Sequence, residues 1–201
     1  MTNTTQNFTL YQTDEKTGNE EFTLHGSDTG ITLKDFWKWA YSDLLDNTQR
    51  GIMAEFLVSS SLKANGGSSA QIRTNWFPYD ITSPSGRHIE VKSAAYLQSW
   101  TTDFHSQIKY DIAPKLAWDG KNYTTEAKRN CDLFVFCLYT ALTHDKPILN
   151  LDYWEFYVLP VSVLNDKVPA QKTISLSSLL KLEPVKTDYS RLGTIIETIN
   201  L

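Results

Sequence analysis

The sequence predicts an α/β protein in which a central mixed β-sheet is flanked by helices. Three patterns support this fold class. Apolar residues recur at helical spacing before residue 65, a turn between two extended segments predicts a β-hairpin within 79–96, and a nearly continuous apolar run over 132–139 predicts a strand buried on both faces. Helices, a hairpin and a buried strand in this order are typical of a sheet covered by helices.

The length and composition are those of a folded globular protein. The chain has 201 residues, of which 41% are hydrophobic and 21% are charged, so a single domain can form a sizeable core without disulfide or metal cross-links. The sequence has no apolar stretch of about 20 residues and no secretory signal at its start. We therefore expect a cytoplasmic protein without membrane contact. Its two cysteines, Cys131 and Cys137, are expected to be buried free thiols.

Negative charge is concentrated in the N-terminal quarter. The formal net charge of the chain is −4. Residues 1–48 hold eight acids and three lysines, a net −5, so the remaining residues carry +1. The acidic total therefore does not exclude a modest basic groove for nucleic acid in the rest of the chain.

Residues 1–45 are predicted to be an addition that precedes the core. This segment is polar and rich in turn-forming residues, with short strands expected at Phe8 to Tyr11 and at Glu21 to His25. Thr32 is expected to cap a helix, because Asp35 follows three residues later in a capping-box arrangement and apolar residues then recur at helical spacing.

The core is predicted over residues 48–139. It begins with a helix from about Thr48 to Ala64, which the strong stop signal Asn65-Gly66-Gly67 would end. The apolar positions of this helix include Ile52, Phe56 and Leu62. An extended segment is expected at Gln71 to Trp76, and the buried strand at Asp132 to Tyr139 completes the core.

The predicted hairpin lies in the middle of this core. Tyr79 to Thr82 and Arg87 to Tyr96 are expected to be strands, and Ser83-Pro84-Ser85-Gly86 has the composition of a turn. If the loop holds three residues, residues whose numbers add to 170 face each other, which places Asp80 opposite Glu90. A two-residue loop would slide this register by one.

Residues 140–201 are expected to add a strand and two helices to the core. The strand is predicted at Tyr153 to Leu159, and short amphipathic helices are predicted at Ser175 to Leu182 and at Tyr189 to Ile199. The polar stretch 97–130 shows no periodicity that assigns it to either class.

Charged residues of the hairpin form the strongest candidate for a chemical site. The pattern acid-x-Lys occurs at four places in the chain, but only the pair Glu90 and Lys92 lies in a predicted strand with another acid, Asp80, across a turn. Alternation places Glu90 and Lys92 on one face. Two carboxylates on that face repel each other and would favour a hard divalent cation such as Mg²⁺. A neighbouring lysine can orient the attacking water and stabilise charge on a phosphate.

Asp80, a gap of nine residues and then Glu90-Val91-Lys92 resemble the PD-(D/E)xK nuclease superfamily. The resemblance implies a restriction-endonuclease-like core. Members often carry a further acid on the helix before the hairpin, and Glu55 matches that role. In some members a glutamine after the lysine contributes to the site. Gln98 continues the even-numbered face of the strand, so we expect it to contact a phosphate or a metal-bound water. Pro78 departs from the pattern, because it stands two residues before Asp80 instead of next to it.

The resemblance also implies a role for each residue. Asp80 and Glu90 would bind Mg²⁺, or Mn²⁺ in its place, with the carbonyl of Val91 as a third ligand. Lys92 would assist the attacking water, and Glu55 would hold a further water or a second ion. The resemblance implies that the substrate is DNA, although the residues themselves do not distinguish DNA from RNA as the substrate. A homodimer is left open.

Two other interpretations stay open. The fold can serve as a non-catalytic binding or interaction module, or an unrelated α/β domain can carry the motif by chance. In either case Glu90 and Lys92 would be a solvated strand face with a weak ion pair. The aromatic segments at residues 36–39 and 153–157 can stack on bases, but at these spacings we expect them in the core. The four histidines include no pair at zinc-ligand spacing.

Overall fold

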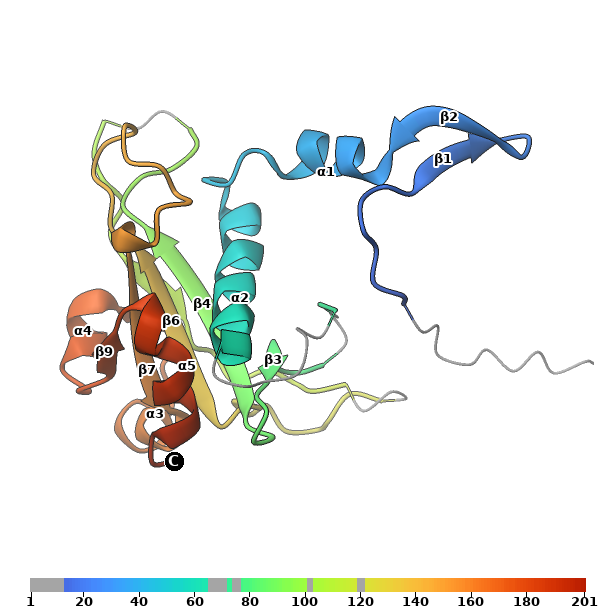
Figure 1. Ribbon diagram of the computed structural model, residues 1–201. Helices are drawn as coiled ribbons and strands as arrows, with labels where there is room; N and C mark the ends of the chain where they lie inside the picture. The colour runs from blue at the N-terminus through green and yellow to red at the C-terminus, as the bar shows by residue number, and fades with distance from the viewer. Residues whose placement is uncertain (1–12, 65–71, 74–76, 101–102, 119–121) are drawn as a thin grey trace, which may run out of the picture. The chain divides into compact units, whose positions relative to one another are not determined.

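The structure, a computed structural model, describes residues 13–64, 72–73, 77–100, 103–118 and 122–201 (Figure 1). Its contacts divide the chain into two compact units, 1–42 and 43–201. The boundary lies close to the predicted end of the N-terminal addition at residue 45. The strand predicted at Phe8 to Tyr11 lies outside the described residues, as do most residues of the segment Gln71 to Trp76.

The N-terminal unit consists of a hairpin and a helix. Strands β1 (Glu21–Leu24) and β2 (Ser27–Thr32) pair antiparallel, and helix α1 (Leu33–Tyr41) follows directly. The predicted capping box is confirmed. The side chain of Thr32 accepts a hydrogen bond from the backbone N–H of Asp35, and the Asp35 carboxylate accepts one from the N–H of Thr32. The helix therefore begins where the sequence predicts.

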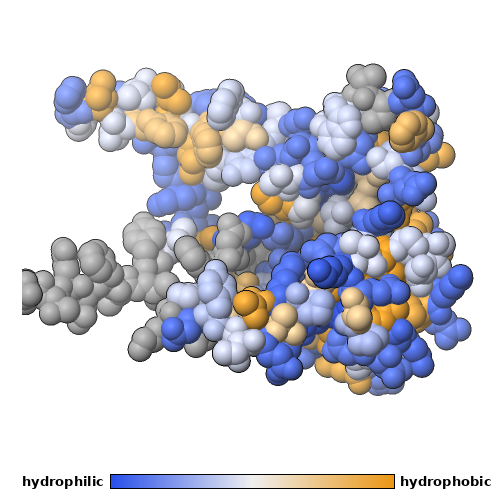
Figure 2. All heavy atoms as spheres, turned by 180° about the vertical axis from the view of Figure 1, so that it is seen from behind, coloured by the Kyte–Doolittle hydropathy of each residue, from blue (hydrophilic) through white to orange (hydrophobic). Residues whose placement is uncertain are grey.

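The apolar side chains of this unit are exposed. Helix α1 has no buried residue. The exposed large apolar residues are Phe22, Leu24, Ile31, Phe36, Trp37, Trp39 and Tyr41, and Figure 2 shows apolar (orange) side chains on the surface of the unit. The expectation that residues 36–39 lie in the core is therefore wrong. Over residues 13–42 the structure describes a hairpin and a short helix, which by themselves offer no second layer against which these side chains can pack.

The larger unit is built on a mixed five-stranded sheet. The strands lie in the order β3-β4-β6-β7-β9, with β4 and β6 parallel and every other neighbouring pair antiparallel. The strands are β3 (Ile81–Thr82), β4 (His88–Ala95), β6 (Leu133–Tyr139), β7 (Trp154–Pro160) and β9 (Val185–Thr187). The predicted mixed sheet is thus confirmed. A separate ribbon pairs β5 (Lys109–Asp111) with β8 (Thr173–Ser175), in regions where the sequence predicts no strand.

Helices cover both faces of this sheet. Helices α2 (Asn47–Ala64) and α5 (Tyr189–Thr198) lie side by side on one face (Figure 1) and share its core cluster with the sheet. A second cluster joins the other face to the β5–β8 ribbon and to helices α3 (Val161–Lys167) and α4 (Leu176–Leu180). A short 3₁₀ turn, η1 (Leu151–Tyr153), precedes β7.

Strand β6 shows why both layers are needed. All seven of its residues are buried, as expected for an apolar run with neighbours on both faces. Helix α2 contributes Ala54, Leu57 and Val58 to the first cluster, whereas Phe56, expected on its apolar side, is 62% exposed. The predicted buried thiols are confirmed, since Cys131 and Cys137 are free and buried. No helix in the described residues is long and apolar enough to cross a membrane.

Candidate active site at the β3–β4 hairpin

The turn between β3 and β4 sets the register of the candidate site. Ile81 pairs with Ile89 and Thr82 with His88, so partner numbers add to 170 and the three-residue loop is confirmed. Gly86 adopts a φ of 86°, a backbone conformation that glycine adopts without a steric penalty. The N–H of Asp80 donates to the carbonyl of Ile89 at 2.9 Å. Hydrogen bonding between the two segments therefore continues to Asp80, although the paired register of β3 covers only Ile81 and Thr82.

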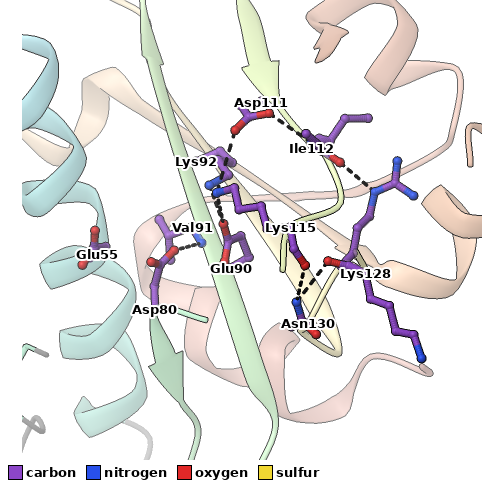
Figure 3. A network of polar contacts seen from close by, with 12 residues as sticks. Glu55, Asp80, Glu90, Val91, Lys92, Asp111, Ile112, Lys115, Lys128 and Asn130 are labelled. Carbon is purple, nitrogen blue, oxygen red and sulfur yellow. Dashed lines mark hydrogen bonds and ion pairs between the residues drawn. The ribbon is translucent and has the colours of Figure 1, made fainter. Parts of the chain in front are cut away.

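Asp80 is held in a polar but poorly hydrated position. Its Oδ2 accepts a hydrogen bond of 2.7 Å from the N–H of Val91 (Figure 3). Burial is the largest of the causes that together raise the pKa of Asp80 to about 6. The negative charges of Glu90 and, to a smaller degree, Glu55 act in the same direction, and the Val91 N–H and Lys92 oppose them. The ionised form of Asp80 thus lacks sufficient positive charge around it.

Glu90 and Lys92 form a partly buried ion pair on the same strand. The Nζ of Lys92 lies 2.5 Å from Oε1 of Glu90, and Glu90 is 9% exposed. Burial alone would lower the pKa of Lys92, but the charge and hydrogen bond of Glu90 outweigh burial and raise it. Lys92 is therefore a fixed cation. The predicted placement of both side chains on one face of a strand is confirmed.

An apolar layer lies beside these charges. In the parallel pair of β4 and β6, Glu90 pairs with Phe134 and Lys92 with Phe136. The two phenylalanine rings stack at 5.5 Å in the second core cluster. Side chains at paired positions share a sheet face, so the ion pair borders a region of low polarity. Electrostatic interactions there are stronger than in open water.

Glu55 approaches Asp80 from helix α2. Figure 3 shows it across from Asp80, and its charge contributes to the raised pKa of that residue. The Glu55 carboxylate is bound by Arg73, with Nε at 2.5 Å from Oε2 and Nη2 at 3.0 Å from Oε1. The predicted position on a helix packed on the sheet is confirmed. The partner Arg73 was not predicted, because it comes from a segment expected only to be extended.

Gln98 lies away from this cluster. Strand β4 ends at Ala95, so the alternation that was expected to carry Gln98 onto the face of Lys92 no longer applies. The Nε2 of Gln98 donates to the carbonyl of Ala95 at 3.3 Å and to Oγ of Ser106 at 2.9 Å. Gln98 instead lines a separate pocket of about 470 Å³ beyond the strand. The expectation of a strand-face position is wrong.

Comparison with known proteins gives the family. The chain matches the family model of bacteriophage T4 endonuclease IV over residues 3–158. The chain belongs to this family. The matched range includes the whole β3–β4 hairpin and helix α2, and membership of an endonuclease family supports a nuclease activity. No curated protein matches the chain.

The acids at the β3–β4 hairpin are the candidate ligands for a metal ion in this chain. The described residues contain no group of three or more His, Cys, Asp or Glu side chains placed to hold one. Mg²⁺ is bound by one or two carboxylates and keeps several waters, and Asp80 is an acid whose pKa is raised first by burial and then by the charge of Glu90. Asp80 and Glu90 are thus the acids from which a site for a hard divalent cation would be built.

Besides Arg73, the sequence analysis did not predict the lysine that contacts Glu90 from another segment. Lys115 brings a second ammonium to Glu90, with its Nζ 3.4 Å from the same Oε1 that Lys92 contacts. It also lies 3.8 Å from Oδ2 of Asp111. Lys115 comes from the polar stretch 97–130, which has no periodicity, so no local pattern predicts that it meets strand β4.

Proposed function

We propose that the protein is a metal-dependent endonuclease that hydrolyses phosphodiester bonds in DNA through a PD-(D/E)xK-type site. The observation that carries the proposal is the meeting of Asp80, Glu90 and Lys92 at one hairpin in a chain of the endonuclease IV family. A motif alone does not establish such a site, but the confirmed register and the family support the same activity.

The two acids would hold the cation. Asp80 and Glu90 would bind Mg²⁺ or Mn²⁺, with the carbonyl of Val91 as the proposed third ligand. The bound ion would neutralise phosphate charge and make water a better nucleophile. The hydrogen bond from the Val91 N–H to Asp80 would hold one carboxylate oxygen in place, so that the carboxyl group is oriented before the ion arrives.

Lys92 would act on the reacting groups. Its ammonium is held beside Glu90 at the border of the apolar layer, where a fixed charge has a large effect. It would orient the attacking water and stabilise the charge that develops on the phosphate. Glu55, held by Arg73, would position a further water on the other side of Asp80.

The test of this proposal is a cleavage assay on the full chain. Supercoiled plasmid, circular single-stranded DNA and RNA are incubated with Mg²⁺, Mn²⁺ or EDTA. We expect cleavage of a DNA circle with either metal and none with EDTA, because a circle has no ends and only an endonuclease can cut it. Asp80→Asn should abolish the cleavage, whereas the control Glu126→Gln, which changes an exposed acid, should not.

Three results would contradict the proposal. Cleavage that persists in EDTA would show that the activity does not depend on a metal ion. Equal cleavage by wild type and Asp80→Asn would show that the active site lies elsewhere. If the wild-type protein binds DNA but cuts no substrate with any metal, the non-catalytic binding module becomes the better interpretation.

A further inference from the structure

Lys115 differs from Lys92 although both contact Glu90. The side chain of Lys92 is 18% exposed and that of Lys115 is 55% exposed. Lys92 lies closer to the shared oxygen, at 2.5 Å against 3.4 Å. Lys115 is thus the more weakly held and the more accessible of the two cations.

The backbone of Lys115 is nevertheless anchored. Lys115 and Lys128 form an antiparallel bridge with N–H to carbonyl hydrogen bonds of 2.8 and 3.0 Å. The Nδ2 of Asn130 donates to both of their carbonyls at 3.1 Å (Figure 3). Nearby, Arg129 donates to the carbonyl of Ile112 at 2.8 Å. The segment therefore holds the base of the Lys115 side chain beside the site, while its ammonium contacts Glu90 and Asp111.

The charges around Glu90 indicate when that ammonium would move. Glu90 shares one carboxylate oxygen between two lysines, and Lys115 also pairs with Asp111. A cation bound by Asp80 and Glu90 would reduce the attraction of Glu90 for both lysines. Lys115 has the weaker contact, so it would be released first. A phosphate of the substrate would then be the nearest strong anion.

We propose that Lys115 is a phosphate-binding residue, whose ammonium exchanges Glu90 and Asp111 for an oxygen of the DNA backbone at or next to the cleavage position. The inference rests on the proposed function and adds a residue to it. A lysine ammonium suits this role, because it is a point charge on a flexible stem that can follow a phosphate through the reaction. Lys92, which is more buried, stays with the attacking water.

The salt dependence of DNA binding tests this proposal. Binding of Lys115→Ala to DNA is measured by fluorescence anisotropy over a range of salt concentrations, with Ca²⁺ in place of Mg²⁺ so that no cleavage occurs. Each phosphate contact contributes about 0.9 to the slope of log K against log[salt] for duplex DNA and about 0.7 for a single strand. We expect the slope of Lys115→Ala to fall by about one such unit.

The matched control is Lys128→Ala. Lys128 is the partner of Lys115 in the same bridge, is 64% exposed and pairs with Glu126 at 3.0 Å. Lys128→Ala removes the same charge as Lys115→Ala but leaves both lysines at Glu90 in place. The salt slope of Lys128→Ala should therefore equal that of the wild type. Lys115→Arg should restore the slope, which shows that a lost positive charge and not a lost fold is the cause.

Neutral phosphates locate the contact. Oligonucleotides that carry a methylphosphonate at one position at a time lack one backbone charge each. When the methylphosphonate stands at or next to the cut, we expect wild type and Lys115→Ala to bind the oligonucleotide equally well. At that position the protein variant and the modified DNA each remove the same contact, so the second change has no further effect. The proposal is wrong if Lys115→Ala and Lys128→Ala have equal slopes, or if the loss persists at every position. If the wild type binds DNA but never cuts it, the nuclease proposal fails while the slopes still decide the role of Lys115.

Discussion

The two faces of strand β4 differ in the kind of residue they present. One face, toward helix α2, carries Ile89, Val91 and Ala95 within the first core cluster. On the other face, Glu90 and Lys92 hold each other by an ion pair at the border of an aromatic layer. Neighbouring residues of one strand thus alternate between core packing and the candidate site. The apolar face stabilises the fold by burial, whereas Glu90 of the charged face contributes to the raised pKa of the nearby Asp80.

The two faces of β4 therefore divide the residues that stabilise the fold from those that would carry out the chemistry. Proteins place strained or repelling charges at functional sites and offset their cost elsewhere. In this protein the offset lies one residue away on the same strand. Substitutions on the two faces should therefore give opposite results, and the following predictions test that expectation in order of decreasing effect.

The largest effect on stability is expected at Ile89. Its side chain is fully buried, so Ile89→Ala should remove burial and leave a cavity between β4 and α2. We expect the free energy of unfolding to fall by about 2–5 kcal/mol, as measured by urea denaturation. The comparison is contradicted if Lys92→Ala, on the other face, lowers stability as much as Ile89→Ala does.

The largest effect on activity is expected at Lys92. Lys92→Ala should slow DNA cleavage by about 100-fold or more, because removal of one group that stabilises developing charge typically has this effect. Its binding of DNA with Ca²⁺ should weaken only modestly, since the residue is one cation among several. A cleavage time course and an anisotropy titration measure the two effects. Equal rates of cleavage by wild type and Lys92→Ala would remove this residue from catalysis.

The raised pKa of Asp80, caused first by burial and then by the charge of Glu90, should appear in the pH dependence of stability. Because the pKa of Asp80 is raised to about 6 in the folded protein, the folded state holds its proton more tightly than the unfolded state. The contribution of Asp80 to stability is present below about pH 4 and is lost as the pH rises to about 6. Without metal, Asp80→Asn should be more stable than wild type at pH 7 by about 1–2 kcal/mol.

This pH effect is measured by thermal unfolding in EDTA from pH 4 to pH 8. Asp80→Asn can still accept the hydrogen bond from Val91, so the variant removes the charge with little change in shape. Glu126→Gln, which removes an exposed acid, is the control and should follow the wild-type profile. A stability difference between Asp80→Asn and wild type that does not change with pH would argue against a charge effect.

The smallest effect is expected from metal binding. A ligand that binds only the folded protein stabilises it by about 1.4 kcal/mol at a tenfold excess over its dissociation constant. Mg²⁺ or Mn²⁺ should therefore raise the melting temperature of the wild type, because the ion neutralises Asp80 and Glu90. Asp80→Asn should lose most of this increase. An equal increase in both proteins would place the metal elsewhere.

The local part of the site is determined by the sequence. The composition of Ser83 to Gly86 predicts the turn but leaves a two-residue and a three-residue loop open, and the structure has the three-residue loop. Strand alternation then places Lys92 beside Glu90. The capping box at Thr32 also begins its helix as predicted. Each of these features depends on residues close together in the chain, where turn and helix rules apply.

The remaining features were decided only by the tertiary structure. Lys115 meets Glu90 across 25 residues, and Arg73 reaches Glu55 from a different segment. The end of β4 at Ala95 moves Gln98 off the strand face, a boundary that no local signal marks. Phe56 has an apolar side chain that packing leaves exposed. Long-range contacts depend on how the layers come together, and periodicity within one element does not contain that information.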